Sequence, residues 1–195
     1  MKLPTTILHQ AQIDSTWTLF LDRDGVINRK LDNDYVKSWD EFEFLPGVLE
    51  ALKSCNAHFG RIIIVTNQQG VGKGLMLEGD LLEIHQKMQD SIEAVGGRLD
   101  AMYFCPNLKE ENPLCRKPDI GMALQAQNDF PEINFSKSIV VGDSFSDMGF
   151  AEKLGAVPVF IYNETPILEN DVKLTWSYHT NLLHFASYIQ PLVKR

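Results

Sequence analysis

The sequence predicts a doubly wound, Rossmann-like α/β fold, with a mostly parallel sheet and helices on both faces. Short apolar, β-branched runs such as residues 61–66 are typical of buried strands. Segments of helix length, with apolar residues three and four positions apart, separate these runs and favour parallel pairing through right-handed crossovers. With 195 residues, 44% of them hydrophobic, the chain can bury one full core, so we expect a single domain over residues 1–195.

The N-terminal half alternates strand and helix twice. In order we expect a strand at 17–21, a loop at 28–44, a helix at 45–57, a strand at 61–66, a turn at 67–74 and a helix at 78–95. Pro46 suits the start of the first helix, because proline lacks an N–H that would go unpaired there. Gly96 and Gly97 end the second helix.

The C-terminal half continues the alternation. We expect strands at 99–104, 137–143, 157–162 and 174–178, and helices at 120–130, 147–154 and 181–193. Three prolines make residues 105–118 irregular. Gly155 ends the helix expected at 147–154. No long insertion follows Asp24 or the second strand, so we expect no separate cap domain.

Composition excludes several classes of protein. The formal net charge of -8 disfavours nucleic acid, because binding to a phosphate backbone needs a basic face. Three cysteines, an odd count, predict no disulfide framework and indicate a reducing compartment. No apolar run is long enough to span a bilayer, and residues 1–16 do not resemble a signal peptide. We expect a cytoplasmic monomer that binds no membrane.

Two carboxylates, Asp22 and Asp24, follow the first strand. Side chains two positions apart on an extended backbone point the same way, so the pair is expected to face one spot. Adjacent carboxylates repel each other unless a cation or hydrogen bonds stabilise them, which suggests a divalent metal. The alternative is a turn in which one aspartate caps a helix, since Asp and Gly are common turn residues.

Three strands of the predicted sheet end in polar residues. The first ends at Asp22, the second at Thr66 and the fourth at Asp143. Ligands of doubly wound folds bind beyond the carboxyl ends of the strands, so these residues are expected to meet at one edge. Turn chemistry explains each one singly but not their convergence.

Four motifs, in this order, resemble those of the haloacid dehalogenase superfamily of phosphatases over nearly the whole chain. They are Asp-Arg-Asp-Gly-Val at 22–26, Thr66, Lys117, and Gly-Asp-Ser-Phe-Ser-Asp at 142–147. Residues 66–70 and 115–118 are similar to the subfamily that contains heptose bisphosphate and histidinol-phosphate phosphatases. The resemblance implies a Mg²⁺-dependent hydrolase of phosphoric monoesters.

The resemblance also implies roles for the first two carboxylates. Asp22 is expected to be the nucleophile and to form an aspartyl-phosphate that water hydrolyses. Asp24 is expected to protonate the leaving alcohol and later to deprotonate the attacking water. That second role needs a carboxyl whose proton affinity is raised by its neighbours.

The expected metal ligands are the Asp22 carboxylate, the main-chain carbonyl of Asp24 and the Asp143 carboxylate, because Mg²⁺ prefers hard oxygens. Asp147 either orients a metal-bound water, outside the direct ligands, or caps the helix that follows. Thr66, with the backbone amide of Asn67 or Gln68, is expected to hold the phosphoryl group, and Lys117 is expected to neutralise its charge.

The segment 105–116 departs from those relatives, which place Cys-x-His and Cys-x-Cys there to bind structural zinc. Asn107 stands where the histidine is expected and Pro113 where the third cysteine is expected. Cys105 and Cys115 alone cannot complete a tetrahedral zinc site, so zinc is not expected.

The substrate is expected to be a small phosphorylated metabolite. Expected substrate-binding residues are Tyr35, Asn67, Gln68 and Arg116. A second phosphate, as in a heptose bisphosphate, can meet Arg29, Lys30, Lys73 or Arg116. Glu110 and Glu111 can instead meet an amine, as in histidinol phosphate. The planar guanidinium of Arg116 beside the motif lysine favours heptose 1,7-bisphosphate, with hydrolysis of its 7-phosphate.

A non-enzymatic receiver-like phosphoacceptor is the rival from another class, because it also places an acidic pair, a Thr and a Lys on a doubly wound sheet. In receivers the acceptor Asp lies on a later strand than the acidic pair. Here Thr66 and Lys117 precede the second acidic cluster, an order that favours the phosphatase.

Overall fold

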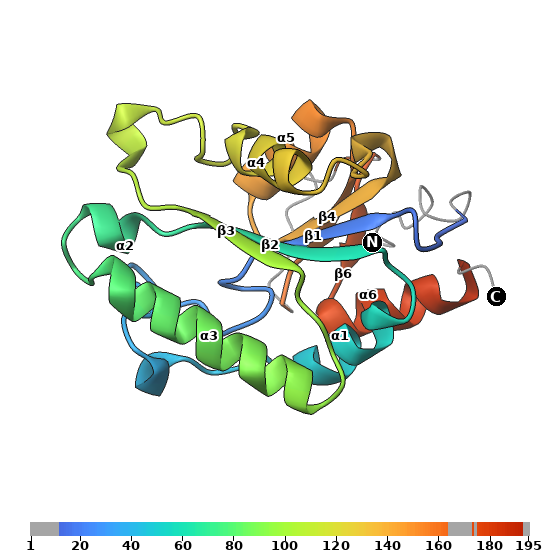
Figure 1. The fold of residues 1–195 in the computed structure, drawn as a ribbon, viewed down its shortest axis with the longest axis horizontal. Coiled ribbons are helices and arrows are strands. Elements are labelled where there is room, and N and C mark those ends of the chain that lie inside the picture. The colour runs from blue at the N-terminus through green and yellow to red at the C-terminus, as the bar shows by residue number, and fades with distance from the viewer. Residues whose placement is uncertain (1–11, 164–172, 174, 193–195) are drawn as a thin grey trace.

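A six-stranded parallel sheet forms the centre of the computed structural model, which describes residues 12–163, 173 and 175–192 (Figure 1). The strands are β1 (Thr18–Leu21), β2 (Arg61–Asn67), β3 (Ala101–Cys105), β4 (Ser138–Gly142), β5 (Val157–Ile161) and β6 (Ser177–His179). Their order in the sheet is β3-β2-β1-β4-β5-β6, and each neighbouring pair is parallel. The predicted doubly wound α/β fold is confirmed.

Strand β1 lies inside the sheet, between β2 and β4. Leu21 pairs with Ile64 of β2 on one side and with Val141 of β4 on the other. All four residues of β1 are buried, because helices cover both faces of the sheet. Leu19 packs into one core cluster and Phe20 into another, as the alternation of side chains along a strand requires.

Helices cover both faces of the sheet. They are α1 (Val48–Asn56), α2 (Gln69–Gly72), α3 (Glu78–Ala94), α4 (Gly121–Asp129), α5 (Phe145–Leu154) and α6 (Leu182–Ile189). In Figure 1, α4 and α5 lie above the sheet, and α1, α3 and α6 lie below it. Short 3-10 turns occupy Trp39–Glu41, Lys109–Glu111, Phe135–Lys137 and Gln190–Leu192.

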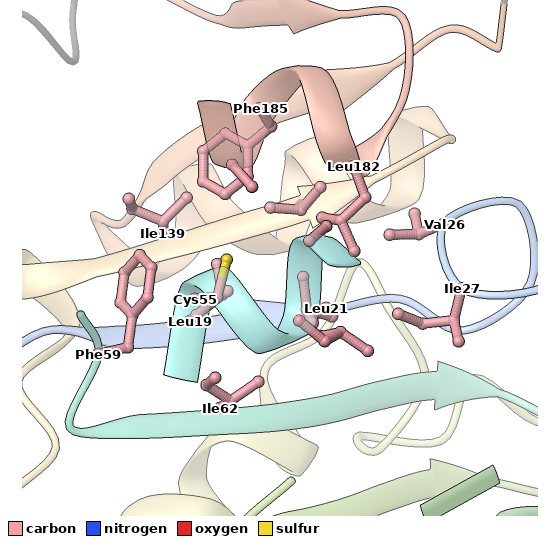
Figure 2. Close-up of a cluster of buried hydrophobic side chains, with 14 of the residues drawn as sticks. Leu19, Leu21, Val26, Ile27, Cys55, Phe59, Ile62, Ile139, Leu182 and Phe185 are labelled. Atoms are coloured by element: carbon pink, nitrogen blue, oxygen red, sulfur yellow. The ribbon is translucent and has the colours of Figure 1, made fainter. Parts of the chain in front are cut away.

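The larger core cluster lies between the sheet and the helices α1, α3 and α6. Figure 2 shows Leu19 and Ile62 from the strands facing Cys55 of α1 and Phe185 of α6. Each of these side chains is buried. Because removing apolar surface from water stabilises the fold by about 25 cal/mol per Å², this cluster is a main source of stability. The cluster holds β1 in place, and with it the residues that follow the strand.

Several elements begin or end away from the predicted bounds. Helix α5 begins at Phe145 rather than 147, because Ser144 caps it. Strand β6 begins at Ser177 rather than 174, because Trp176 N–H donates to Lys173 O in a turn (3.1 Å). The segment 67–74, expected as a turn, contains α2. The expected limits at residues 174 and 193 lie outside the described residues.

Among the described residues, every helix is too short or too polar to cross a lipid bilayer.

Candidate active site

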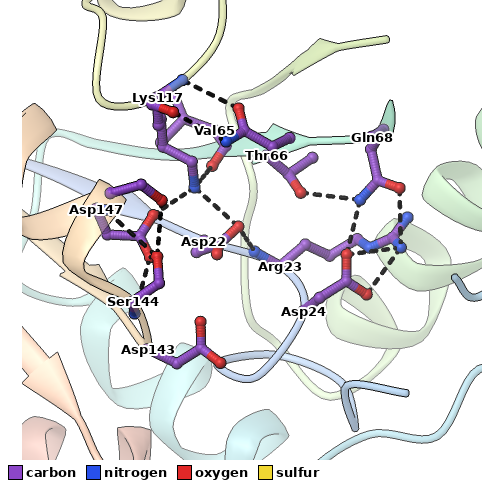
Figure 3. Close-up of polar contacts among 12 residues, drawn as sticks. Asp22, Arg23, Asp24, Val65, Thr66, Gln68, Lys117, Asp143, Ser144 and Asp147 are labelled. Carbon is purple, nitrogen blue, oxygen red and sulfur yellow. Dashed lines mark hydrogen bonds and ion pairs between the residues drawn. The ribbon is translucent and has the colours of Figure 1, made fainter. Parts of the chain in front are cut away.

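The carboxyl edge of the sheet brings the predicted strand-end residues together (Figure 3). Asp22 directly follows β1. Its backbone N–H donates to Val141 O of β4 (2.9 Å), so the hydrogen bonding between these two strands continues to Asp22. Thr66 lies near the end of β2 and is buried, and Asp143 follows β4 directly. Three strands therefore deliver their polar residues to one place, as the sequence predicted.

Lys117 reaches the same place from the loop between β3 and α4. Its Nζ lies 2.9 Å from Asp22 Oδ1 and 2.5 Å from Asp147 Oδ1, and it donates to Val65 O (2.7 Å). Burial lowers the pKa of Lys117, but the charges of Asp147 and Asp22 outweigh burial and raise its pKa above the ordinary value. The lysine is thus a fixed, buried cation beside Asp22.

Asn67 holds the backbone of this lysine. Asn67 Oδ1 accepts from Lys117 N–H (3.0 Å), and Asn67 Nδ2 donates to Lys117 O (3.2 Å). The side chain of Asn67 therefore positions Lys117. Asn67, whose backbone amide was expected to contact the phosphoryl group, also lines the pocket described below.

Three carboxylates gather beside Lys117. One oxygen from each of Asp22, Asp143 and Asp147 lies within 4.8 Å of the others. Burial and the charge of Asp147 raise the pKa of Asp22 to about 7, although Lys117 opposes them. Burial also raises the pKa of Asp143 against the opposing charge of Lys30. The cluster is short of positive charge.

This donor set fits a hard divalent cation. Its carboxylate oxygens come from three backbone positions and are close enough to share one ion. Burial, with a smaller contribution from the charge of Asp147, raises the pKa of both Asp22 and Asp143, so a cation at this point would stabilise their ionised forms. Residues Asp22 and Asp143 were predicted metal ligands, whereas Asp147 was expected only behind the direct ligands.

Asp147 also serves the helix α5. Its Oδ2 accepts from the backbone N–H of Ser144 (3.1 Å), and the Ser144 side chain faces Asp147 N–H in return (3.4 Å). This reciprocal arrangement is a capping box, in which Ser144 is the capping residue and Asp147 the third helical residue. Asp147 is therefore not the N-cap, and its two oxygens have different partners: Ser144 for one and Lys117 for the other.

Asp24 points away from the carboxylate cluster, unlike the prediction. Its side chain accepts from Arg23 Nη2 (2.9 and 3.0 Å), Asn28 Nδ2 (2.9 Å) and Gln68 Nε2 (2.7 Å). The backbone turns at this point, because Ile27 N–H donates to Arg23 O (2.8 Å), so Asp22 and Asp24 do not lie on one face of an extended strand.

The proton affinity of Asp24 also differs from the prediction. Burial raises the pKa of Asp24, but the charge of Arg23 and the hydrogen bonds from Arg23, Asn28 and Gln68 outweigh burial and lower the pKa. The expected raised proton affinity belongs instead to Asp22.

Gln68 and Arg23 form the support of Asp24. Gln68 is buried, and its side chain donates to both Asp24 Oδ2 (2.7 Å) and Thr66 Oγ1 (2.9 Å). Its backbone amide, one of the two expected to hold the phosphoryl group, donates to Cys105 O (2.8 Å). Arg23 is fully buried, and its Nη1 lies 3.4 Å from His85 Nε2. Burial and the charge of Arg23 lower the pKa of His85 to about 3, so the ring is neutral.

Sequence reasoning missed Arg23, Asn28 and His85 as parts of this support. A charged residue inside an otherwise buried motif was the available signal for Arg23, because buried charges are paired. For His85, in the middle of α3, the sequence held no comparable signal.

A pocket of about 220 Å³ opens beside these residues. It is lined by Asp22, Asp24, Lys30, Leu31, Asp34, Tyr35, Val36, Thr66, Asn67, Lys117, Ser144 and Ser146. Asp22 and Asp24 thus face the same cavity even though their carboxylates do not share partners. Tyr35 lies in it as predicted, with Lys73 Nζ 5.3 Å from the ring centroid.

The other loop residues expected near the substrate lie outside the pocket lining: Arg29, Lys73, Glu110, Glu111 and Arg116. Arg29 pairs with Glu43 (3.2 Å) and is exposed. Glu111 accepts from Asn107 Nδ2 (3.1 Å). Arg116 is half-buried, and its Nη1 has no hydrogen-bond partner among the residues that the structure describes.

Cys105 and Cys115 form a disulfide (Sγ–Sγ 2.04 Å), while Cys55 is a buried free thiol. The odd cysteine count predicted no disulfide framework, and that inference did not anticipate this single bond across the loop 105–115. Because zinc binds thiolates, a disulfide leaves the loop without its two sulfur ligands. The expectation that the loop holds no zinc stays a prediction.

Comparisons with known proteins agree with the site. Residues 18–165 match the family model of polynucleotide kinase 3 phosphatase. A D-glycero-alpha-D-manno-heptose-1,7-bisphosphate 7-phosphatase of Mycobacterium tuberculosis is 45% identical over 140 residues, covering 72% of this chain and 74% of that protein. A D-glycero-beta-D-manno-heptose-1,7-bisphosphate 7-phosphatase of Helicobacter pylori is 33% identical over 181 residues, covering 91% and 99%.

Solved structures of heptose bisphosphate phosphatases are also similar to this chain. The D,D-heptose 1,7-bisphosphate phosphatase of B. bronchiseptica, complexed with magnesium and phosphate, superposes with a TM-score of 0.80 at 28% identity, covering 90% of this chain and 98% of that one. The corresponding enzyme of Burkholderia thailandensis gives a TM-score of 0.65 at 32% identity, covering 89% and 99%.

Proposed function

Because this chain belongs to the polynucleotide kinase 3 phosphatase family within the haloacid dehalogenase superfamily, and is a phosphatase, we propose that it removes the 7-phosphate of D-glycero-D-manno-heptose 1,7-bisphosphate. The observation that carries the chemistry is the group of Asp22, Asp143 and Asp147 around one point, with Lys117 beside them. The substrate rests on the names of relatives at 33–45% identity.

Asp22, Asp143 and Asp147 would hold Mg²⁺, together with the main-chain carbonyl of Asp24. When bound, the ion supplies positive charge for the transferring phosphoryl oxygens and for the crowded carboxylates. This assignment is supported by the magnesium and phosphate in the B. bronchiseptica structure.

Asp22 acts as the nucleophile. A carboxylate oxygen of Asp22 attacks the phosphorus, the bond from phosphorus to the sugar oxygen breaks, and the phosphoryl group stays on Asp22. Lys117, held by Asn67 and Val65 O, favours the ionised form of Asp22 and orients its carboxylate. Thr66 lies in the pocket wall and offers a hydroxyl to a phosphoryl oxygen.

Asp24 handles the protons at the edge of the same pocket. It gives a proton to the departing sugar oxygen, and in the second step it takes one from the water that hydrolyses the aspartyl-phosphate. The donors Arg23, Asn28 and Gln68 stabilise the carboxylate form, which favours the second step and disfavours the first. The acid role of Asp24 therefore rests on the resemblance of residues 22–26 to the superfamily motif and not on its pKa.

A phosphate-release assay with Mg²⁺ tests the proposal. The purified protein is offered both anomers of heptose 1,7-bisphosphate, histidinol phosphate and other sugar phosphates. We expect the highest kcat/KM for a heptose bisphosphate. A higher value for histidinol phosphate would overturn the substrate, and stable single phosphorylation without turnover would overturn the enzyme in favour of a receiver-like module.

A further inference from the structure

Lys30 occupies an unusual place at the pocket. It follows the motif loop directly, lines the pocket, and its Nζ donates to both oxygens of Asp143 (3.1 and 2.8 Å). Its side chain is 53% exposed, whereas that of Asp143 is 12% exposed. Lys30 is thus a half-exposed cation bound to a nearly buried carboxylate of the candidate metal site.

The other cations near the pocket have different partners. Lys117 is buried between Asp22 and Asp147 and serves the reacting end. Arg29 pairs with Glu43 outside the lining, and Lys73 lies over the ring of Tyr35. Within the part of the chain that the structure describes, Lys30 and Lys117 are the cations that line this pocket.

Asp143 cannot serve two cations equally. Lys30 hydrogen-bonds to both of its oxygens, and Asp143 also belongs to the three-carboxylate cluster that fits Mg²⁺. A divalent ion at the cluster takes over the negative charge of Asp143, so Lys30 loses its partner. Its long, half-exposed side chain can then reach an anion within the pocket.

We propose that Lys30 is a specificity residue with two positions: it neutralises Asp143 in the metal-free protein, and after Mg²⁺ displaces it, it binds the substrate phosphate that is not hydrolysed. This inference rests on the proposed function, because only a bisphosphate substrate carries a second phosphate for Lys30 to bind. It makes metal binding a condition for recognising that second phosphate.

The first test measures metal binding without turnover. Isothermal titration of Mg²⁺ compares wild type with Lys30→Gln and with Arg29→Gln, which removes the same charge from the adjacent residue outside the pocket lining. We expect Lys30→Gln to bind Mg²⁺ about threefold to fivefold more tightly, because no lysine has to be displaced, and Arg29→Gln to match wild type. Equal affinities for all three proteins would overturn the displacement.

The second test measures substrate recognition. We expect Lys30→Gln to raise KM for heptose 1,7-bisphosphate about tenfold relative to KM for heptose 7-phosphate, both measured at saturating Mg²⁺. Lys30→Arg keeps the charge and should retain most of the affinity. An equal rise in both KM values, or a rise in neither, would overturn the role of Lys30.

The two proposals fail in different ways. If wild type does not hydrolyse heptose bisphosphate, the proposed function fails, and the second position of Lys30 fails with it. If wild type hydrolyses it well but Lys30→Gln behaves like Arg29→Gln in both tests, only the inference about Lys30 is wrong.

Discussion

Asp22 and Asp24 are two positions apart, yet their carboxyl groups respond to opposite surroundings. Burial and neighbouring carboxylates raise the pKa of Asp22 to about 7, whereas Arg23 and two amide donors outweigh burial at Asp24 and lower its pKa. The difference follows from the turn at Arg23, which directs one side chain to the carboxylate cluster and the other to hydrogen-bond donors. Asp22 and Asp24 therefore line the same pocket but have different electrostatic surroundings.

Replacement of the nucleophile gives the first prediction. Asp22→Asn should lower kcat by about 10⁴-fold or more, because an amide is a poor nucleophile. The fold should stay nearly intact, since Lys117 keeps Asp147 as its partner. Single-turnover phosphate release measures the loss, and circular dichroism checks the fold. Substantial residual activity in a correctly folded variant would contradict the covalent mechanism.

Replacement of the acid gives the second prediction. Asp24→Asn should slow hydrolysis of a sugar phosphate by about 100-fold or more, because the leaving alkoxide needs a proton. Nitrophenyl phosphate, whose leaving group departs without one, should be slowed much less. The ratio of the two kcat/KM values is the measurement. Equal slowing of both substrates counts against Asp24 as the acid.

At this scale the sequence predicted which residues gather but not how they pair. The order of Asp22, Thr66, Lys117 and Asp143 identified the site, because each follows or ends a strand. The support of Asp24 was not predictable, because it depends on a backbone turn and on His85 from a distant helix. Likewise, the hydrogen bonds by which the Asn67 side chain holds Lys117 were not predicted.

Among the elements, helix α5 and the loop 105–115 show what local sequence can reveal. The Ser144 and Asp147 spacing is that of a capping box, so the helix start at Phe145 was readable from the sequence. The Cys105–Cys115 bond was not, because pairing depends on the distance between two positions that the irregular loop leaves open. This loop leads directly to Arg116 and Lys117.

Reduction of that bond gives the third prediction. The bond spans a sequence separation of 10, and a loop of that size is expected to contribute about 2–3 kcal/mol to the free energy of unfolding. Dithiothreitol should therefore shift the urea midpoint of wild type downward, and should leave the midpoint of a Cys105→Ala/Cys115→Ala variant unchanged. If the reductant has no effect on wild type, the bond does not stabilise the folded protein.

The whole molecule places its site where the strand order reverses. From β1 the sheet extends through β2 to β3 on one side and from β4 to β6 on the other, so the crossovers diverge between β1 and β4. Asp22 and Asp143 follow the two strands that flank this point, where doubly wound folds bind their ligands. The sequence predicted parallel strands, but their spatial order depends on packing between distant segments and was not readable.

Stability of the whole molecule against acid gives the fourth prediction, at the far edge of the sheet. His179 is buried in β6, with its Nε2 2.9 Å from Ser177 Oγ and its Nδ1 3.3 Å from His184 Nδ1. Burial and the charge of His184 lower the pKa of His179 to about 3. Between about pH 6.5 and 3 the unfolded chain therefore binds a proton here that the folded protein does not, so this histidine makes stability fall as the pH falls.

The matching variant is His179→Gln, which keeps a polar side chain but removes the titrating group. Its free energy of unfolding should fall less steeply than that of wild type between pH 6 and 4, by up to about 1.4 kcal/mol per pH unit. Urea unfolding in EDTA measures both proteins, so that metal binding at the distant carboxylates adds no pH dependence of its own. Asp22 titrates in both proteins, so its opposite contribution cancels in the difference between their free energies of unfolding. Parallel pH profiles would show that His179 is protonated equally in the folded and unfolded states.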